Sequence, residues 1–174
     1  LYAWGTHRSD DFAWWRNRLR KILDWVDVVR IDHFRGFEAC WEIPGGAQTA
    51  ADGRWVEAPG REVFNAFVKD WGLPLPVIAE DLGVITDGVI ALRDDFQLPG
   101  IRVEQFAFGS DDMKNTFLPE VYDEHCVAYT GTHDNDTVVG WFNSDAGENS
   151  TRSQSDIDAE RAETLSYFGT DGSE

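Results

Sequence analysis

The segment Val26-Asp27-Val28-Val29-Arg30-Ile31-Asp32 decides the fold class, because its β-branched residues predict a short buried strand. A helix is predicted directly before it, starting at Asp10, with Ser9 or Asp10 as the cap. The evidence for that helix is a set of apolar residues that recur at helical spacing on one face: Phe12, Trp15, Leu19, Ile22 and Leu23.

The alternation of helix and strand continues along the chain. Three more strands are predicted, at residues 77–80, 101–106 and 126–130. Four more helices are predicted, at residues 61–71, 86–96, 135–143 and 156–168. Thr86 is the expected cap of one of them, and Gly169 the expected end of another. Residues 36–60 contain Trp41 and Trp55, which indicates an ordered excursion rather than a linker.

Helices that alternate with strands imply right-handed crossovers and a parallel sheet. No glycine-rich phosphate loop follows a strand, which disfavours a dinucleotide-binding fold. The predicted fold class is therefore α/β, a partial TIM (β/α)8 barrel. A complete barrel has eight strands and about 250 residues, so about four βα units make half of one.

The composition excludes several classes of partner. The 174 residues include 32 Asp+Glu against 15 Lys+Arg, a formal net charge of −17, and 42% are hydrophobic. That apolar content excludes a disordered chain. The charge argues against nucleic acid and against an anionic membrane, since phosphate binding needs clustered Lys and Arg. No run of about 18 apolar residues predicts a transmembrane helix. Residues 145–174 are predicted to be a solvated acidic tail.

The chain ends and the two cysteines indicate the context of the chain. The chain opens on Leu1 and its only methionine is Met113, so we expect both termini to be cuts within a longer protein. Cys40 and Cys126 lie in apolar settings outside any CxxC pattern, which predicts buried reduced thiols and a reducing compartment.

Acidic residues follow three of the predicted strands. Asp32 and His33 follow the first strand, Glu80 the second, and His133 and Asp134 the fourth. Catalytic groups of such barrels lie at the carboxyl ends of strands, so these residues form a candidate active site.

Paired carboxylates suit glycosyl transfer with retention, which needs a nucleophile and an acid about 5 to 5.5 Å apart. Neighbouring strands lie about 4.8 Å apart, which is compatible with that distance. Arg30 lies two residues before Asp32 on the same face, and is expected to hold that carboxylate ionised by lowering its pKa. Glu80 follows apolar residues, so it suits the proton donor, whose pKa must be raised.

Simpler alternatives remain open at this point. Arg30 and Asp32 suit a structural ion pair, and Glu80 with Asp81 suits a loop cap. The pair His133 and Asp134 suits the closing of a turn or a cap of the next helix. Asp, His and Glu at strand ends also suit a metal site. Three aromatic residues in loops or near strand ends are candidates for stacking on sugar rings: Trp41, Trp55 and Phe106.

Three motifs resemble one known family. They are Val-Arg-Ile-Asp-His-Phe-Arg-Gly at 29–36, Ile-Ala-Glu-Asp-Leu-Gly-Val-Ile-Thr at 78–86 and Tyr-Thr-Gly-Thr-His-Asp-Asn-Asp-Thr at 129–137. Together they closely resemble amylomaltases, the 4-α-glucanotransferases of glycoside hydrolase family 77. The resemblance covers residues 1 to about 143 and is weak in the acidic tail. It implies that 1–174 is a fragment of the catalytic barrel domain, with strands four to seven.

The resemblance also implies the roles of the site residues. Asp32 matches the nucleophile, Glu80 the general acid/base, and Asp134 the third carboxylate. Arg30 and His133 match residues that bind around the bond-cleaving subsite, and Phe106 matches a residue lining the glucan cleft. No cofactor and no metal are implied, and the family habit with the cysteines suggests a cytoplasmic location.

The implied reaction transfers an α-1,4-glucan segment through a covalent glucosyl-enzyme. The donor is a maltooligosaccharide or amylose, and the acceptor is the 4-hydroxyl of a glucan or glucose. Two alternatives are an amylase-like retaining hydrolase and a non-catalytic glucan-binding fragment. Half a barrel exposes strand edges, so the isolated chain is expected to be poorly stable and inactive.

Overall fold

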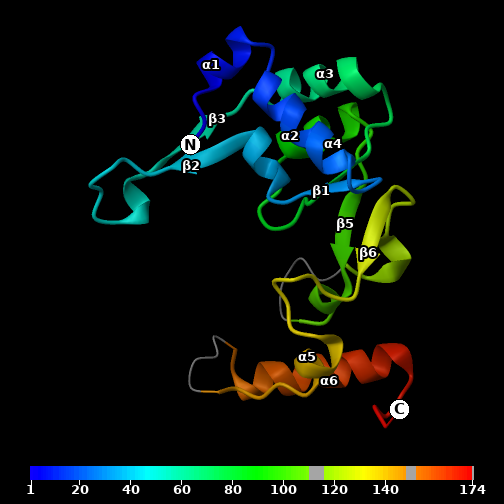
Figure 1. Cartoon of the computed structure of the whole chain (residues 1–174). Helices are drawn as coiled ribbons and strands as arrows, with labels where there is room; N and C mark the ends of the chain where they lie inside the picture. Colours follow the sequence, from blue (N-terminus) through cyan, green and yellow to red (C-terminus); the bar gives the residue numbers. More distant parts are fainter. Residues whose placement is uncertain (110–115, 148–151, 174) are drawn as a thin grey trace. The chain divides into compact units, whose positions relative to one another are not determined.

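The computed structural model describes residues 1–109, 116–147 and 152–173, which form two compact units, Leu1–Ile101 and Arg102–Glu174 (Figure 1). The first unit contains α1 Trp4–Ser9, α2 Ala13–Leu23, β1 Val29–Ile31, η1 Phe34–Phe37, β2 Ala39–Glu42, η2 Ala50–Asp52, β3 Arg54–Glu57, α3 Gly60–Trp71, β4 Val77–Ala79 and α4 Asp87–Asp95. The division falls within β5, Gly100–Val103. The second unit continues with η3 Glu104–Ala107, η5 Pro119–Val121, β6 Cys126–Tyr129, α5 Val138–Phe142 and α6 Gln154–Phe168.

The parallel arrangement predicted from the sequence is confirmed for β1 and β4. Val29 pairs with Val77, and Ile31 pairs with Ala79. The helices α2, α3 and α4 contribute Leu19, Val63, Phe64, Ala66, Phe67, Val89 and Leu92 to the core of this unit. Its fully buried side chains include Phe34, Phe64, Phe67, Val63 and Val89. The mixed α/β class is therefore confirmed.

Helix α2 begins at Ala13, later than predicted. Phe12 adopts a left-handed conformation with φ 56°, which no helix can continue through, and its side chain is buried. Asp10, one of the two predicted caps, accepts a hydrogen bond from the Ala13 N–H at 3.2 Å. The six residues of α1 form a separate short helix that the apolar periodicity did not indicate.

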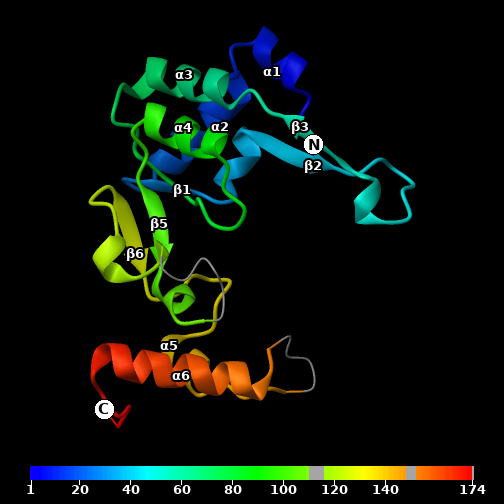
Figure 2. The ribbon, with the colours of Figure 1, turned by 180° about the vertical axis from the view of Figure 1, so that it is seen from behind.

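The ordered excursion at 36–60 is confirmed and contains an antiparallel hairpin. Strands β2 and β3 pair with Trp41 opposite Trp55, and the two rings meet edge to face at 5.5 Å. Within the first unit the hairpin extends away from the three core helices, as both views show (Figures 1 and 2). The sequence did not indicate these strands, because each has four residues and a long turn separates them.

In the second unit, β5 pairs with β6. The predicted strand 101–106 ends at Val103, since the chain turns into η3 and brings Phe106 to the end of the strand. Thr86 caps α4 as predicted, accepting a hydrogen bond from the Val89 N–H at 3.4 Å. Gly169 ends α6 with φ 64°, also as predicted.

A buried ion pair fixes the segment that follows β4. The side chain of Asp81 is 4% exposed and accepts hydrogen bonds from Arg93 at 2.5 Å and from the Ile101 N–H at 2.8 Å. It therefore links the end of β4 to α4 and to β5. Gly100 lies so close that a Cβ there would meet the carboxylate at 2.6 Å, which explains why this position has no side chain.

We predict that Asp81→Ala costs about 3 to 5 kcal/mol of stability, because it leaves the Arg93 guanidinium buried without its carboxylate. Urea unfolding of the variant measures this cost. The matched control is Asp94→Ala, which removes the exposed partner of the same arginine and should cost less than about 1 kcal/mol. Equal effects of the two variants would contradict the assignment.

Candidate active site

Asp32 and Glu80 lie at the same edge of the parallel pair, as their positions in the sequence predict. Each follows directly on one of the register partners Ile31 and Ala79. The Glu80 N–H donates to the Ile31 carbonyl at 2.9 Å, and the Phe34 N–H donates to the Glu80 carbonyl at 3.1 Å. Backbone hydrogen bonds thus hold the two acidic residues on neighbouring strand ends.

Arg30 contacts Asp32 as predicted. Its Nη2 atom lies 2.5 Å from Asp32 Oδ1. The guanidinium side chain is 25% exposed, whereas the carboxylate side chain is 61% exposed. The arginine therefore braces one oxygen of Asp32 from within the strand, and solvent still reaches the carboxylate.

Backbone donors hold the Glu80 carboxylate. Oε2 accepts from the His33 N–H at 2.6 Å, and Oε1 accepts from the Leu82 N–H at 3.0 Å. His33 is left-handed, with φ 49°, an uncommon conformation for a residue other than glycine. The residue after Asp32 thus adopts a strained conformation while its N–H donates to the Glu80 carboxylate.

His133 and Asp134 lie in a tight turn of the second unit. The turn is closed by Asn135, whose Oδ1 accepts from both the N–H and the hydroxyl of Thr132 at 2.9 Å. The side chains of His133 and Asp134 are 61% and 72% exposed and lie 3.3 Å apart. The Asp134 N–H also donates to the Thr132 hydroxyl at 3.3 Å, while both side chains remain largely exposed.

Phe106 and Asp134 share a cavity of about 550 Å³ in the second unit, lined also by Gln105, Asn135 and Asp136. The Phe106 ring is 40% exposed and packs edge to face on Phe117 at 5.4 Å. The structure thus brings together two of the predicted site residues, a carboxylate and an aromatic ring.

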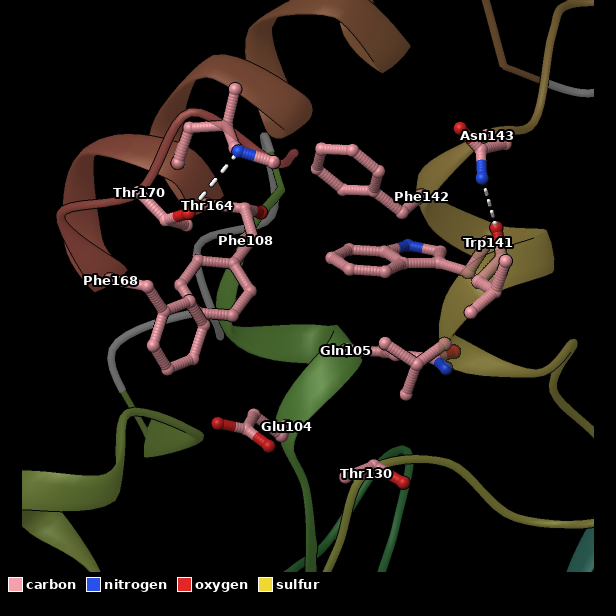
Figure 3. Close-up of a pocket in the computed structure, with 14 residues that line it drawn as sticks. Glu104, Gln105, Phe108, Thr130, Trp141, Phe142, Asn143, Thr164, Phe168 and Thr170 are labelled. Atoms are coloured by element: carbon pink, nitrogen blue, oxygen red, sulfur yellow. Dashed lines mark hydrogen bonds between the residues drawn. The ribbon is translucent and has the colours of Figure 1, made fainter. Parts of the chain in front are cut away.

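A second hollow of this unit is mainly apolar. It encloses about 390 Å³ between η3, α5 and α6, and the rings of Phe108, Trp141, Phe142 and Phe168 surround it (Figure 3). Asn143 at its edge donates to the Val139 carbonyl at 3.0 Å. None of the six predicted site residues is among the described residues that line this hollow, so the hollow is not part of the candidate site.

Two supporting residues escaped the sequence interpretation. Asp81 was considered only as a loop cap, yet it anchors the segment that carries Glu80. Asn135, which the sequence predicts at the start of a helix, closes the turn that carries Asp134. Their proximity to predicted site residues was the available signal.

Within the described ranges, no helix is long and apolar enough to cross a membrane.

We predict that Asn135→Ala loosens the turn, because both hydrogen bonds to its Oδ1 are lost. Hydrogen exchange of the Thr132 amide should speed up by about 10-fold. The matched control is Asn143→Ala, whose side chain makes one exposed hydrogen bond at the end of α5. Unchanged exchange at Thr132 in the Asn135 variant would show that the turn is held by other contacts.

Comparisons with known proteins agree in one family. The family model for 4-alpha-glucanotransferases, glycoside hydrolase family 77, matches residues 1–173. A 4-alpha-glucanotransferase from Thermus thermophilus is 55% identical over 144 residues, covering 82% of this chain and 28% of the relative. One from Synechocystis is 54% identical over 143 residues, again covering 82% and 28%.

A solved structure agrees with the sequence comparisons. The amylomaltase from Streptococcus agalactiae in complex with acarbose matches 100% of this chain and 33% of its own, with a TM-score of 0.83 and 37% identity. The chain thus spans about a third or less of the length of the relatives and the structure it matches.

Proposed function

The chain belongs to the 4-alpha-glucanotransferase family, glycoside hydrolase family 77, and we propose that the whole protein carrying it transfers α-1,4-glucan segments between sugars. The observation that carries the proposal is the placement of Asp32 and Glu80 on neighbouring ends of a parallel strand pair. Neighbouring strands lie about 4.8 Å apart, which suits a retaining double displacement.

In the first half-reaction, Asp32 attacks the anomeric carbon of the donor glucan. A bond forms between its carboxylate oxygen and that carbon while the glycosidic bond breaks. Arg30 orients the nucleophile through the contact at Oδ1, which leaves the second oxygen for attack. The departing chain takes a proton from Glu80 at its 4-oxygen.

In the second half-reaction, Glu80 removes the proton from the 4-hydroxyl of the acceptor. That oxygen attacks the anomeric carbon, and Asp32 is released. Each Glu80 oxygen accepts a backbone hydrogen bond. We propose that one of these two hydrogen bonds to Glu80 breaks when the carboxyl group turns toward the glycosidic oxygen.

The second unit contributes sugar contacts in this proposal. Asp134 and His133 bind hydroxyl groups of the sugar that reacts, and Phe106 lines the glucan cleft. Their exposed polar atoms and the shared cavity of Phe106 and Asp134 support these roles. Carboxylate acceptors beside an aromatic face are suited to neutral sugars.

The finer organisation is also a proposal. We assign β1, β4, β5 and β6 to strands four to seven of a (β/α)8 barrel, and residues 1–174 to its catalytic domain, with 145–174 as an acidic segment. The proposed partners are a maltooligosaccharide or amylose donor and a glucan or glucose acceptor, without nucleic acid or membrane. A cytoplasmic location is proposed, because Cys40 and Cys126 are free cysteines.

We predict that Asp32→Asn and Glu80→Gln each lower transfer from maltotriose by at least about 1,000-fold in the whole protein. A glycosyl fluoride needs no proton donor to leave, so Glu80→Gln given α-maltosyl fluoride should accumulate a maltosyl adduct on the peptide containing Asp32. Mass spectrometry measures the adduct. The control is Asp27→Asn, which should leave transfer unchanged. A maltosyl adduct on a residue other than Asp32 would contradict the assignment of Asp32 as the nucleophile.

The products separate transfer from hydrolysis, the competing function. Transfer from maltotriose yields glucose together with oligomers longer than the substrate, whereas hydrolysis yields only shorter sugars. Chromatography of the products distinguishes the two. Binding of maltotriose without either set of products would favour the non-catalytic alternative.

Metal removal tests the remaining alternative. We predict that transfer activity is unchanged, within about 2-fold, after dialysis against a chelator, because nucleophile and acid/base are both side chains. The control is the same protein dialysed without chelator. A loss of activity that added Ca²⁺ or Zn²⁺ restores would instead support a metal-dependent site at the strand ends.

A further inference from the structure

A separate cavity of about 250 Å³ lies beside Asp32 in the first unit. Asp32 and His33 form part of its wall. The rest of the wall comes from the start of the chain, from α2, from η1 and from β2: Leu1, Tyr2, Trp4, Trp15, Gly36, Phe37, Cys40 and Glu42. The cavity is therefore continuous with the proposed nucleophile, but most of its lining has no role in the reaction described above.

Aromatic rings make up one wall of this cavity. Trp4 and Trp15 are stacked, with ring centres 5.9 Å apart and planes at 16°. Tyr2 lies against both, at 5.2 Å from Trp4 and 4.7 Å from Trp15, yet remains 48% exposed. The indoles thus hold Tyr2 in place while leaving part of its ring accessible, which is the arrangement of a stacking platform.

Glu42 supplies a polar group on another wall. Alternation along β2 puts Cys40 and Glu42 on the cavity side of the strand, and Trp41 on the opposite side with Trp55. Among the described residues, the half-buried Glu42 carboxylate has no hydrogen-bond or ion-pair partner. The buried Trp15 indole N–H likewise has no acceptor there. Polar groups in such settings normally have partners, so the Glu42 carboxylate is a candidate acceptor for a ligand's hydroxyl groups, whereas the Trp15 N–H is too buried to reach one.

The charge of the lining selects the class of ligand. Two carboxylates, Asp32 and Glu42, face the cavity, and its lining side chains include neither Lys nor Arg. An anionic ligand is disfavoured by that charge, whereas a neutral ligand with many hydroxyl donors finds acceptors and an aromatic face.

We propose that Tyr2 and Glu42 bind a further glucose unit of the glucan in this cavity. The ring of Tyr2 stacks on the sugar, and Glu42 accepts hydrogen bonds from its hydroxyl groups. This inference rests on the proposed function, because the glucan must reach Asp32 for its next unit to enter the cavity. Tyr2 and Glu42 would then be residues that select longer glucans.

Cys40 provides a direct measurement of occupancy, since its thiol lies in the cavity wall. In the whole protein, saturating maltoheptaose should slow alkylation of Cys40 by N-ethylmaleimide by about 5-fold or more, as followed by peptide mass spectrometry. The reaction of Cys126 in β6 is the internal reference. Sorbitol at the same concentration is the control solute and should protect neither cysteine.

Variants link the protection to the two residues. Tyr2→Ala and Glu42→Gln should each abolish the protection and raise KM for maltoheptaose by about 10-fold, with kcat changed by less than about 2-fold. Tyr2→Phe keeps the ring and should behave as the unchanged protein. The controls are Glu57→Gln on the same hairpin and Trp25→Ala, which is 88% exposed and outside the cavity.

The outcomes separate this inference from the proposed function. Protection that persists in Tyr2→Ala and Glu42→Gln, with KM unchanged, overturns the inference even if glucan transfer is confirmed. If maltoheptaose protects Cys40 through these residues but no transfer occurs, the sugar site stands and the proposed reaction fails. Should Tyr2→Ala not fold, Glu42→Gln decides alone, because no described group pairs with its carboxylate.

Discussion

The carboxylate of Asp81 is the constraint on which the candidate site depends. It is buried between the end of β4, α4 and β5, and it accepts hydrogen bonds from Arg93 and from the Ile101 N–H. A buried charge is costly unless it is paired and hydrogen-bonded, so the chain cannot shift here without leaving it unsatisfied. Glu80 immediately precedes Asp81, and its position is therefore fixed by an interaction that takes no part in the chemistry.

Asp32, the acidic residue on the neighbouring strand end, is fixed by β1 and by Arg30. Asp32 continues the strand β1, which is in register with β4, and Arg30 braces it from the same strand. His33 then turns into the left-handed region and donates its N–H to Glu80. The strain at this one residue is offset by a hydrogen bond between the two strand ends, so the pair of carboxyl groups is held by the backbone of one unit.

Much of this arrangement was predictable because it is local. Acidic residues that follow predicted strands indicated Asp32, Glu80 and Asp134, and the spacing of Arg30 and Asp32 predicted their contact. The left-handed turn at Phe12 and the hairpin at 39–57 were not predictable. The turn depends on tertiary burial of the Phe12 ring, and the hairpin on the cross-strand contact of the half-exposed Trp41 and Trp55, and neither leaves a periodic pattern. The roles of the site residues are still predictions.

The three carboxylates differ in the kind of backbone that holds them. Asp32 and Glu80 directly follow paired strands of the first unit, and the backbone N–H groups of His33 and Leu82 hold the Glu80 carboxylate. Asp134 belongs to the second unit and is carried by a turn that one asparagine closes. A group on such a turn adapts to a sugar more readily than a group on a paired strand end. In the proposed mechanism, the two carboxyl groups that act on the glycosidic bond thus follow paired strands, whereas the third carboxylate, the proposed sugar ligand, lies on a turn.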